Sequence, residues 1–156
     1  MRAGITLAGP AAAEKALIMT IYTIGYGGRK PEELLELLKV KGVRAVVDVR
    51  LRPDRSAMGI YAKAKTADKG IERLLTGAGF QYFSFVELGN LFQELADWPE
   101  RYQRMLDSSG DLLTQRLGAV PVPFCLMCAE KLVAECHRRL IAEFLAVRGH
   151  QVEHIE

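Results

Sequence analysis

All three cysteines of the chain fall in one short stretch toward its C-terminal end, together with a histidine, a carboxylate and two arginines. The residues are Cys125, Cys128, Glu130, Cys136, His137, Arg138 and Arg139. A thiol beside an imidazole can act as an activated nucleophile, a carboxylate can act as a general base, and arginines bind anions. The candidate catalytic residues are therefore Glu130, His137, Cys128 and Cys136.

An anion or nucleotide pocket is the interpretation that uses most of these residues. A helix predicted to begin near Cys136 would direct its free N–H groups and positive dipole end at a phosphate group. We predict ligand contacts at Gly25, Tyr26, Asp48, Arg50, Arg52, Gly89 and Arg138. His137 is then the candidate acid or base, and Glu130 is its orienting partner or itself the base. The hypothesis is binding of a phosphate-bearing or nucleotide-like ligand, with hydrolase or transferase activity as an extension of it.

Structural roles for the same residues stay open. Asp48 and Arg50 are two positions apart on one strand and face the same way, which suits a buried ion pair as well as ligand contact. Glu130 can cap the final helix or pair with Arg138. His137 can equally be a structural histidine whose ring nitrogens are satisfied by hydrogen bonds.

Cysteine chemistry offers two further interpretations. Zinc would need four ligands, for which the candidates are Cys125, Cys128, Cys136 and His137. Residues an odd number of positions apart on a strand point to opposite faces, so Cys125 and Cys128 cannot share an ion, and no metal is predicted. A thiol/disulfide redox protein using Cys128 and Cys136 is the other alternative, because the loop between them can fold back. No motif indicates an organic cofactor.

A basic loop over residues 50–69 supplies a second functional class. Its candidate contacts with nucleic acid are Arg52, Arg55, Lys63 and Lys65. Tyr61 lies between them and could stack on a base while they neutralise phosphates. The same composition also fits a solvated loop, and the net charge of +2 does not by itself indicate a surface that binds polyanions.

Five apolar or β-branched stretches are predicted as strands. They are residues 18–24, 43–49, 80–85, 120–127 and 151–155. Helical patterns separate them, at residues 31–39, 71–75, 91–117 with a break at 108–110, and from Leu132 or Cys136 to Val147. Alternation of strands and helices favours an α/β fold: a single-domain three-layer sandwich with an open, mostly parallel sheet of about five strands and helices on both faces. Ligands in such sheets bind at the carboxyl ends of the strands.

The predicted helical region also carries an apolar stripe, expected in the core or at the surface of a homodimer. Its members are Phe92, Leu95, Trp98, Tyr102 and Met105. Helical spacing places them on one side of the chain.

Domain boundaries follow from composition. Residues 1–17 are small and Ala-rich without a clear pattern, so we expect a tail outside the core, either disordered or the result of an early start assignment with Met19 as the natural first residue. Residues 18–156 are then the single α/β domain. No apolar run approaches the ~20 residues of a membrane-spanning helix, so no membrane partner is expected. Three cysteines without a secretory signal favour free thiols and a cytoplasmic location.

Several short motifs follow one another along the chain. They are Thr23-Ile24-Gly25, Asp48-Val49-Arg50, Leu88-Gly89, Cys128-Ala129-Glu130, Cys136-His137-Arg138 and Val152-Glu153-His154-Ile155. This set resembles the domain-of-unknown-function 488 family over roughly Met19 to the C-terminus. Asn90 stands where a second glycine is common, and Leu132-Val133 replaces the more usual Asp-Pro. The resemblance implies an α/β sandwich with a site at these motifs, and it brings no established reaction.

Overall fold

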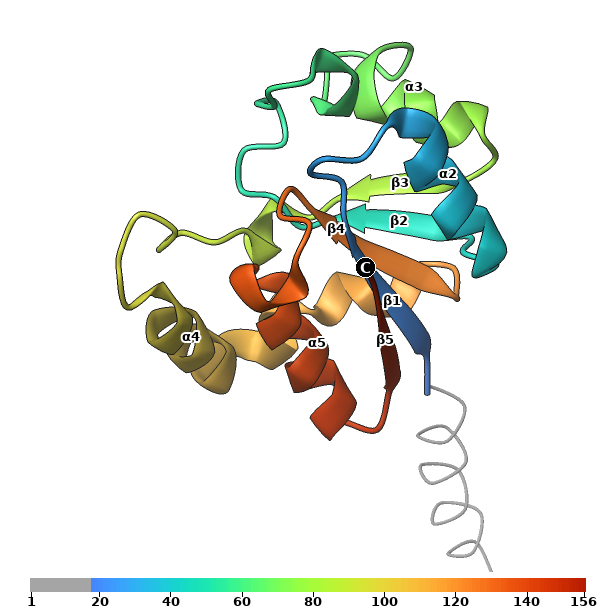
Figure 1. Ribbon diagram of the computed structural model, residues 1–156. Coiled ribbons are helices and arrows are strands. Elements are labelled where there is room, and N and C mark those ends of the chain that lie inside the picture. Colours follow the sequence, from blue (N-terminus) through green and yellow to red (C-terminus); the bar gives the residue numbers. More distant parts are fainter. Residues whose placement is uncertain (1–17) are drawn as a thin grey trace, which may run out of the picture.

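The structure is a computed structural model that describes residues 18–156 (Figure 1). Its five strands form one parallel sheet in the order β3-β2-β4-β1-β5. The strands are β1 (Thr20–Gly25), β2 (Ala45–Asp48), β3 (Gln81–Ser84), β4 (Phe124–Cys128) and β5 (Gln151–Ile155). The predicted α/β class is confirmed, with every strand parallel. The predictions about residues 1–17 lie outside the described residues.

Two pairs of helices cover the two faces of the sheet (Figure 1). The helices are α2 (Pro31–Val40), α3 (Gly70–Gly77), α4 (Trp98–Leu113) and α5 (Arg138–Val147). The first pair packs on one face and the second pair on the other. The central strand β4 serves both layers, because Leu126 and Cys128 join the core beneath α4 and α5 while Cys125 and Met127 join the opposite core.

The strand register brings three chain segments to one edge. Gly25 at the end of β1 lies opposite Cys128 at the end of β4, and Asp48 at the end of β2 lies opposite Met127. These strand ends are the starting points of the segments that carry most of the predicted site residues. The sheet therefore gathers the predicted clusters at its carboxyl edge, as the parallel topology requires.

The predicted break in the helical region at residues 108–110 is wrong. Helix α4 runs through these residues to Leu113, and a short 3₁₀ segment, Gln115–Ala119, follows it. Gly110 is buried because the Phe144 ring from α5 packs where its side chain would be. Tertiary packing of α4 against α5 thus outweighs the low helix propensity of glycine.

The start of the last helix lies later than either predicted position. Helix α5 begins at Arg138, after a 3₁₀ turn, Val133–Glu135, and an extended Cys136. His137 therefore stands at the junction between the loop and the helix.

The apolar stripe is mainly part of the core. Tyr102 is fully buried and donates a hydrogen bond of 2.6 Å to the carbonyl of Leu88. Phe92, Trp98 and Met105 are partly buried against the same core, and Leu95 is exposed. The homodimer surface stays a prediction. Across residues 18–156, no helix combines the length and the apolar character needed to cross a bilayer.

Candidate functional site

A cavity of about 350 Å³ opens at the carboxyl edge of the sheet. Its lining includes Tyr26, Arg50, Arg52, Arg55, Asn90, Cys128, Glu130 and His137. The segments that follow β1, β2 and β4 all contribute to it, together with the start of α5. Most of the predicted site residues are thus brought together, although not all in the roles expected of them.

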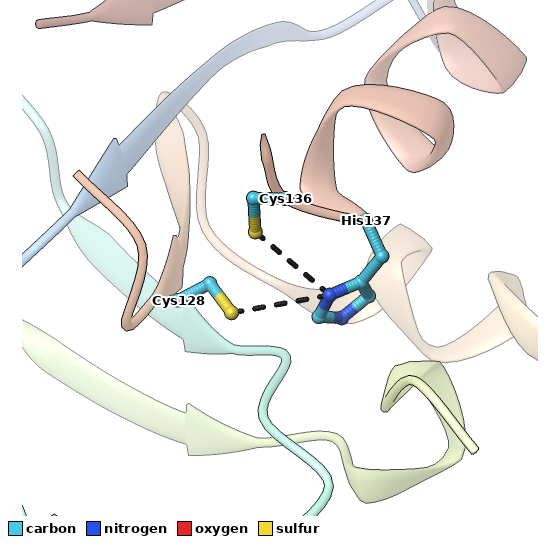
Figure 2. Close-up of side chains that lie close together, drawn as sticks. All are labelled: Cys128, Cys136 and His137. Carbon is cyan, nitrogen blue, oxygen red and sulfur yellow. Dashed lines mark hydrogen bonds between the residues drawn. The ribbon is translucent and has the colours of Figure 1, made fainter. Parts of the chain in front are cut away.

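Cys128, Cys136 and His137 form a buried sulfur–imidazole cluster (Figure 2). Nδ1 of His137 lies 3.9 Å from Sγ of Cys128 and 3.8 Å from Sγ of Cys136. Strand β4 ends at Cys128 with its side chain on the α5 side of the sheet, where the loop before α5 returns Cys136 and His137. The sulfur–nitrogen contacts are at the long end of hydrogen-bonding distance, so the hydrogen bonds within the cluster are weak.

The orientation of the His137 ring is set by the main chain of another strand end. Nε2 lies 2.9 Å from the carbonyl oxygen of Val49, which can only accept, so Nε2 carries a hydrogen. The ring also packs edge-on against Tyr102, with 5.3 Å between the ring centroids. Nδ1 therefore faces the two sulfurs.

The cluster strongly perturbs its own titration. The neighbouring Cys128 thiol lowers the pKa of Cys136 well below its ordinary value, with His137 adding to the effect and burial opposing it. Contact with Cys136, together with burial, raises the pKa of Cys128. Burial lowers the pKa of His137, but contact with Cys136 outweighs it and raises that pKa. Of the two thiols, Cys136 is therefore the one that gives up its proton more readily.

The start of α5 supports the Cys136 sulfur. The backbone N–H of Arg138, the first residue of the helix, donates to Sγ of Cys136 over 3.4 Å. The positive end of the helix is thus directed at a sulfur atom of the chain itself. The predicted use of this helix end for a phosphate stays a prediction.

Glu130 contacts a thiol and not the histidine. Its Oε2 accepts a hydrogen bond of 3.1 Å from Cys128 Sγ, and residues 18–156 contain no hydrogen bond between Glu130 and His137. The orienting partner of His137 is accordingly the Val49 carbonyl, which the sequence did not indicate. Glu130 is partly exposed in the cavity and is available as a base.

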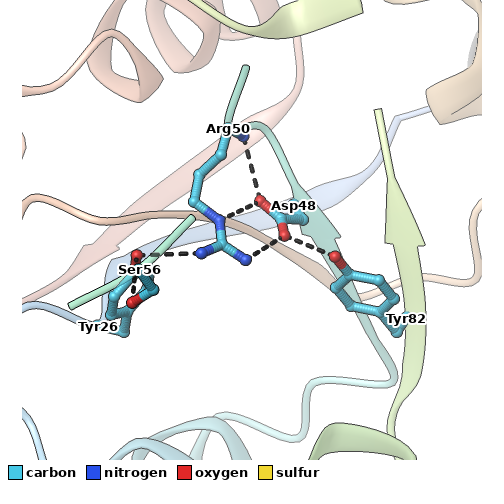
Figure 3. A network of polar contacts seen from close by, with 5 residues as sticks. All are labelled: Tyr26, Asp48, Arg50, Ser56 and Tyr82. Carbon is cyan, nitrogen blue, oxygen red and sulfur yellow. Dashed lines mark hydrogen bonds and ion pairs between the residues drawn. The ribbon is translucent and has the colours of Figure 1, made fainter. Parts of the chain in front are cut away.

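Asp48 and Arg50 form the ion pair that the sequence left open as a structural alternative (Figure 3). Arg50 donates to both carboxylate oxygens, with Nε–Oδ1 and Nη2–Oδ2 distances of 2.8 and 2.6 Å. Tyr82 donates to Oδ2 over 2.6 Å, and Arg50 Nη1 donates to the Tyr26 hydroxyl over 3.0 Å. Burial raises the pKa of Tyr82, and Asp48 raises it further. We call Asp48, Arg50, Tyr26 and Tyr82 the carboxylate network.

Arg138 is fully buried and does not line the cavity. Its guanidinium donates to the carbonyls of Glu130 and Lys131 and, through Nε, to the hydroxyl of Thr23 over 3.3 Å. These bonds hold the loop after β4 against β1. The guanidinium thereby donates hydrogen bonds to the loop backbone and not, as the sequence had predicted, to a ligand.

The glycines at the site make room for the protein's own backbone. A side chain at Gly25 would meet the carbonyl of Glu130, and one at Gly89 would meet the backbone of Leu51. Both glycines permit close packing of neighbouring loops. They shape the walls of the cavity, and neither is among the residues that line it.

The basic loop is folded back onto the protein. Tyr61 is 1% exposed, its hydroxyl donates to the Arg29 carbonyl over 2.7 Å, and its ring packs on Tyr26. The expectation that Tyr61 could stack on a base is therefore wrong for this conformation. Arg52 and Arg55 line the cavity, whereas Lys63 does not.

Asn90 lines the cavity but is not among the site residues that the sequence predicted. It is 5% exposed and lines the cavity, and its Oδ1 accepts a hydrogen bond from the Phe92 backbone. Within residues 18–156 its amide NH₂ has no hydrogen-bond partner. Its position directly after Gly89, at a point where it departs from the usual motif, was the available signal.

Comparison with known proteins gives one finding. No curated protein and no solved structure matches the chain. A family model described as "Domain of unknown function DUF488" matches residues 30–145, which is well over half of the sequence. The chain therefore belongs to this family of proteins whose function is unknown.

Proposed function

We propose that the protein binds a small phosphate-bearing or nucleotide-like anion in the cavity at the carboxyl edge of its sheet. The observation that carries the proposal is Arg55, an exposed cation that lines this cavity. Among residues 18–156 its guanidinium has no ion-pair or hydrogen-bond partner. An arginine in this state is available for charge-assisted hydrogen bonds to a phosphate.

The arginines around the cavity differ in how far they are already occupied. Arg50 is bonded to both oxygens of Asp48. Arg52 contacts exposed Asp54 at 3.4 Å, a long contact between solvated groups. Arg52 and Arg55 are therefore the cations that a ligand can recruit, and Arg50 acts by positioning Tyr26 in the cavity wall.

The size of the cavity and its other lining residues favour a small ligand. Its volume of about 350 Å³ falls toward the lower end of the range of ~300–1,000 Å³ that is usual for small-molecule sites. Asn90 offers an unpaired amide donor, and Glu130 offers a carboxylate beside the Cys128 thiol. A ligand anchored by Arg55 would thus share the cavity with groups able to transfer a proton, which makes hydrolysis or group transfer the reaction classes to test.

Binding can be tested by calorimetric titration with inorganic phosphate, pyrophosphate and nucleoside mono- and diphosphates. Arg55→Gln is expected to weaken binding about 10-fold or more, because a hydrogen bond to a charged group contributes ~1.5–3 kcal/mol. Arg73→Gln is the matched control, since Arg73 is an exposed arginine of α3 that is not part of the cavity wall. The proposal fails if no member of the panel binds, or if the two variants weaken binding equally.

A further inference from the structure

We propose that Cys128, Cys136 and His137 bind one zinc ion, or another divalent ion that prefers thiolate ligands, with a fourth coordination position open to the cavity. The sequence argued against zinc because it required Cys125 as a ligand. The structure places Cys125 in the opposite core and brings the other three together without it. Two thiolates and one imidazole are a donor set that zinc favours, and catalytic zinc sites use three protein ligands.

The distances suit a single ion. The two sulfurs and a ring nitrogen of His137 lie within 4.8 Å of one another, and the sulfur–Nδ1 distances are 3.9 and 3.8 Å (Figure 2). A tetrahedral zinc with bonds of ~2.3 Å to sulfur and ~2.0–2.1 Å to nitrogen separates sulfur from nitrogen by about 3.6 Å and sulfur from sulfur by about 3.8 Å. The two sulfur–nitrogen distances therefore need to shorten by only a few tenths of an ångström, and the sulfur–sulfur distance, which is at most 4.8 Å, by no more than about 1 Å. Rotamer adjustment can supply such changes.

Neighbouring backbone groups orient the His137 ring and stabilise the Cys136 sulfur as metal ligands. The Val49 carbonyl holds a hydrogen on Nε2 of His137, so Nδ1 can direct its lone pair at an ion. Metal-binding histidines characteristically donate their second ring N–H to a carbonyl or carboxylate in this way. The backbone N–H of Arg138 points at the Cys136 sulfur and supports its negative charge as a thiolate ligand.

The open position can be reached from solvent. Cys128 and His137 line the cavity, which gives an ion a route to the buried cluster. Glu130 lines the same cavity, with its Oε2 3.1 Å from Cys128 Sγ, and so stands beside the ion rather than among its three ligands. Zinc acidifies a water bound at such an open position, and a neighbouring carboxylate can accept the proton.

The test is titration of the reduced full-length protein with Co²⁺ under anaerobic conditions, after removal of metals with a chelator. We expect one cobalt per chain, with thiolate-to-cobalt charge-transfer absorption and the visible bands of tetrahedral cobalt, both displaced by Zn²⁺. X-ray absorption of the zinc form should show two sulfur ligands. Cys136→Ser and Cys128→Ser should each weaken binding by at least about 100-fold, the upper end of the effect of losing an outer partner of a metal ligand.

Two controls separate this proposal from others. Cys125→Ala removes the third thiol from the opposite core and should bind cobalt as the wild type does. Arg55→Gln should also keep full metal affinity, so loss of anion binding and loss of metal binding are measured independently. Circular dichroism of each serine variant establishes that it is folded, and the X-ray absorption of the wild type tests the ligands without any substitution.

Absence of a stoichiometric metal complex in the reduced wild type would overturn the proposal. A complex without sulfur ligands, or one that Cys125→Ala weakens as much as the serine variants do, would overturn it as well. If the reduced protein binds no metal and forms a Cys128–Cys136 disulfide in air, the thiol/disulfide alternative takes its place.

Discussion

Two buried polar groups lie at the same edge of the sheet and differ in how well they are satisfied. In the carboxylate network, Asp48 accepts close hydrogen bonds from Arg50 and Tyr82, at 2.6 to 2.8 Å. In the sulfur–imidazole cluster, the contacts between sulfur and nitrogen are 3.8 and 3.9 Å. The first group is complete as it stands, whereas the second holds three good ligand atoms that are only weakly bonded to one another.

This difference suggests a structural role for the carboxylate network and a functional role for the sulfur–imidazole cluster. A fully satisfied charged network in the interior stabilises one conformation and leaves little for a ligand to bind. Weakly bonded thiols and an oriented imidazole retain the capacity to bind an ion or to react. We infer that the carboxylate network holds the cavity wall in place and that the cluster, with Arg55 and Glu130 nearby, is the functional part of the edge.

The largest expected effect comes from breaking the carboxylate network. Asp48→Asn leaves the Arg50 guanidinium buried without its counter-charge, and losing one partner of a buried pair typically costs ~3–5 kcal/mol. Urea denaturation should therefore show a large fall in the free energy of unfolding. Asp54→Asn removes the exposed partner of Arg52 and should change stability little. Equal effects in the two variants would contradict the assignment of a structural role to Asp48.

A second substitution acts on the cluster side of the same edge. In Gly25→Ala the new methyl group meets the Glu130 carbonyl, so the loop after Cys128 must move. We expect a loss of stability of about 3 kcal/mol, the upper end for overpacking, together with weaker cobalt binding. Gly77→Ala is the control because nothing lies near the added methyl group, and it should leave cobalt binding unchanged. Cobalt binding of wild-type strength in Gly25→Ala would show that the loop does not position Cys128.

The smallest expected effect comes from removing a single hydrogen bond of the carboxylate network. Tyr82→Phe removes one hydrogen bond to Asp48 but leaves both bonds from Arg50, so the expected cost is about 1.5 kcal/mol. Tyr22→Phe is a matched control, because in residues 18–156 the Tyr22 hydroxyl has no hydrogen bond. Chemical denaturation measures both variants. A cost for Tyr82→Phe no larger than that for Tyr22→Phe would remove Tyr82 from the network.

Local patterns were enough to predict the layers of the fold and the edge at which the candidate site residues gather. Alternation along β4 correctly separates Cys125 from Cys128, since side chains on a strand alternate between faces whatever the remainder of the chain does. The prediction for α4 failed because Gly110 is a weak helix former by itself, and its contact with Phe144 comes from a distant part of the chain. Helix propensity is local, and the packing that overrides it is not.

For the candidate site too, some features follow from the sequence and others from the tertiary structure. By itself, the sequence determined which residues reach the carboxyl edge, because parallel strands must end there together. Only the tertiary structure decided their partners: Arg138 bonds to backbone carbonyls, Tyr61 is buried, and Cys136 meets His137 and Cys128. Such pairings depend on distances of a few ångströms between segments far apart in the chain. Residue types and spacing limit which contacts can form, and the packing of the helices and loops selects among them.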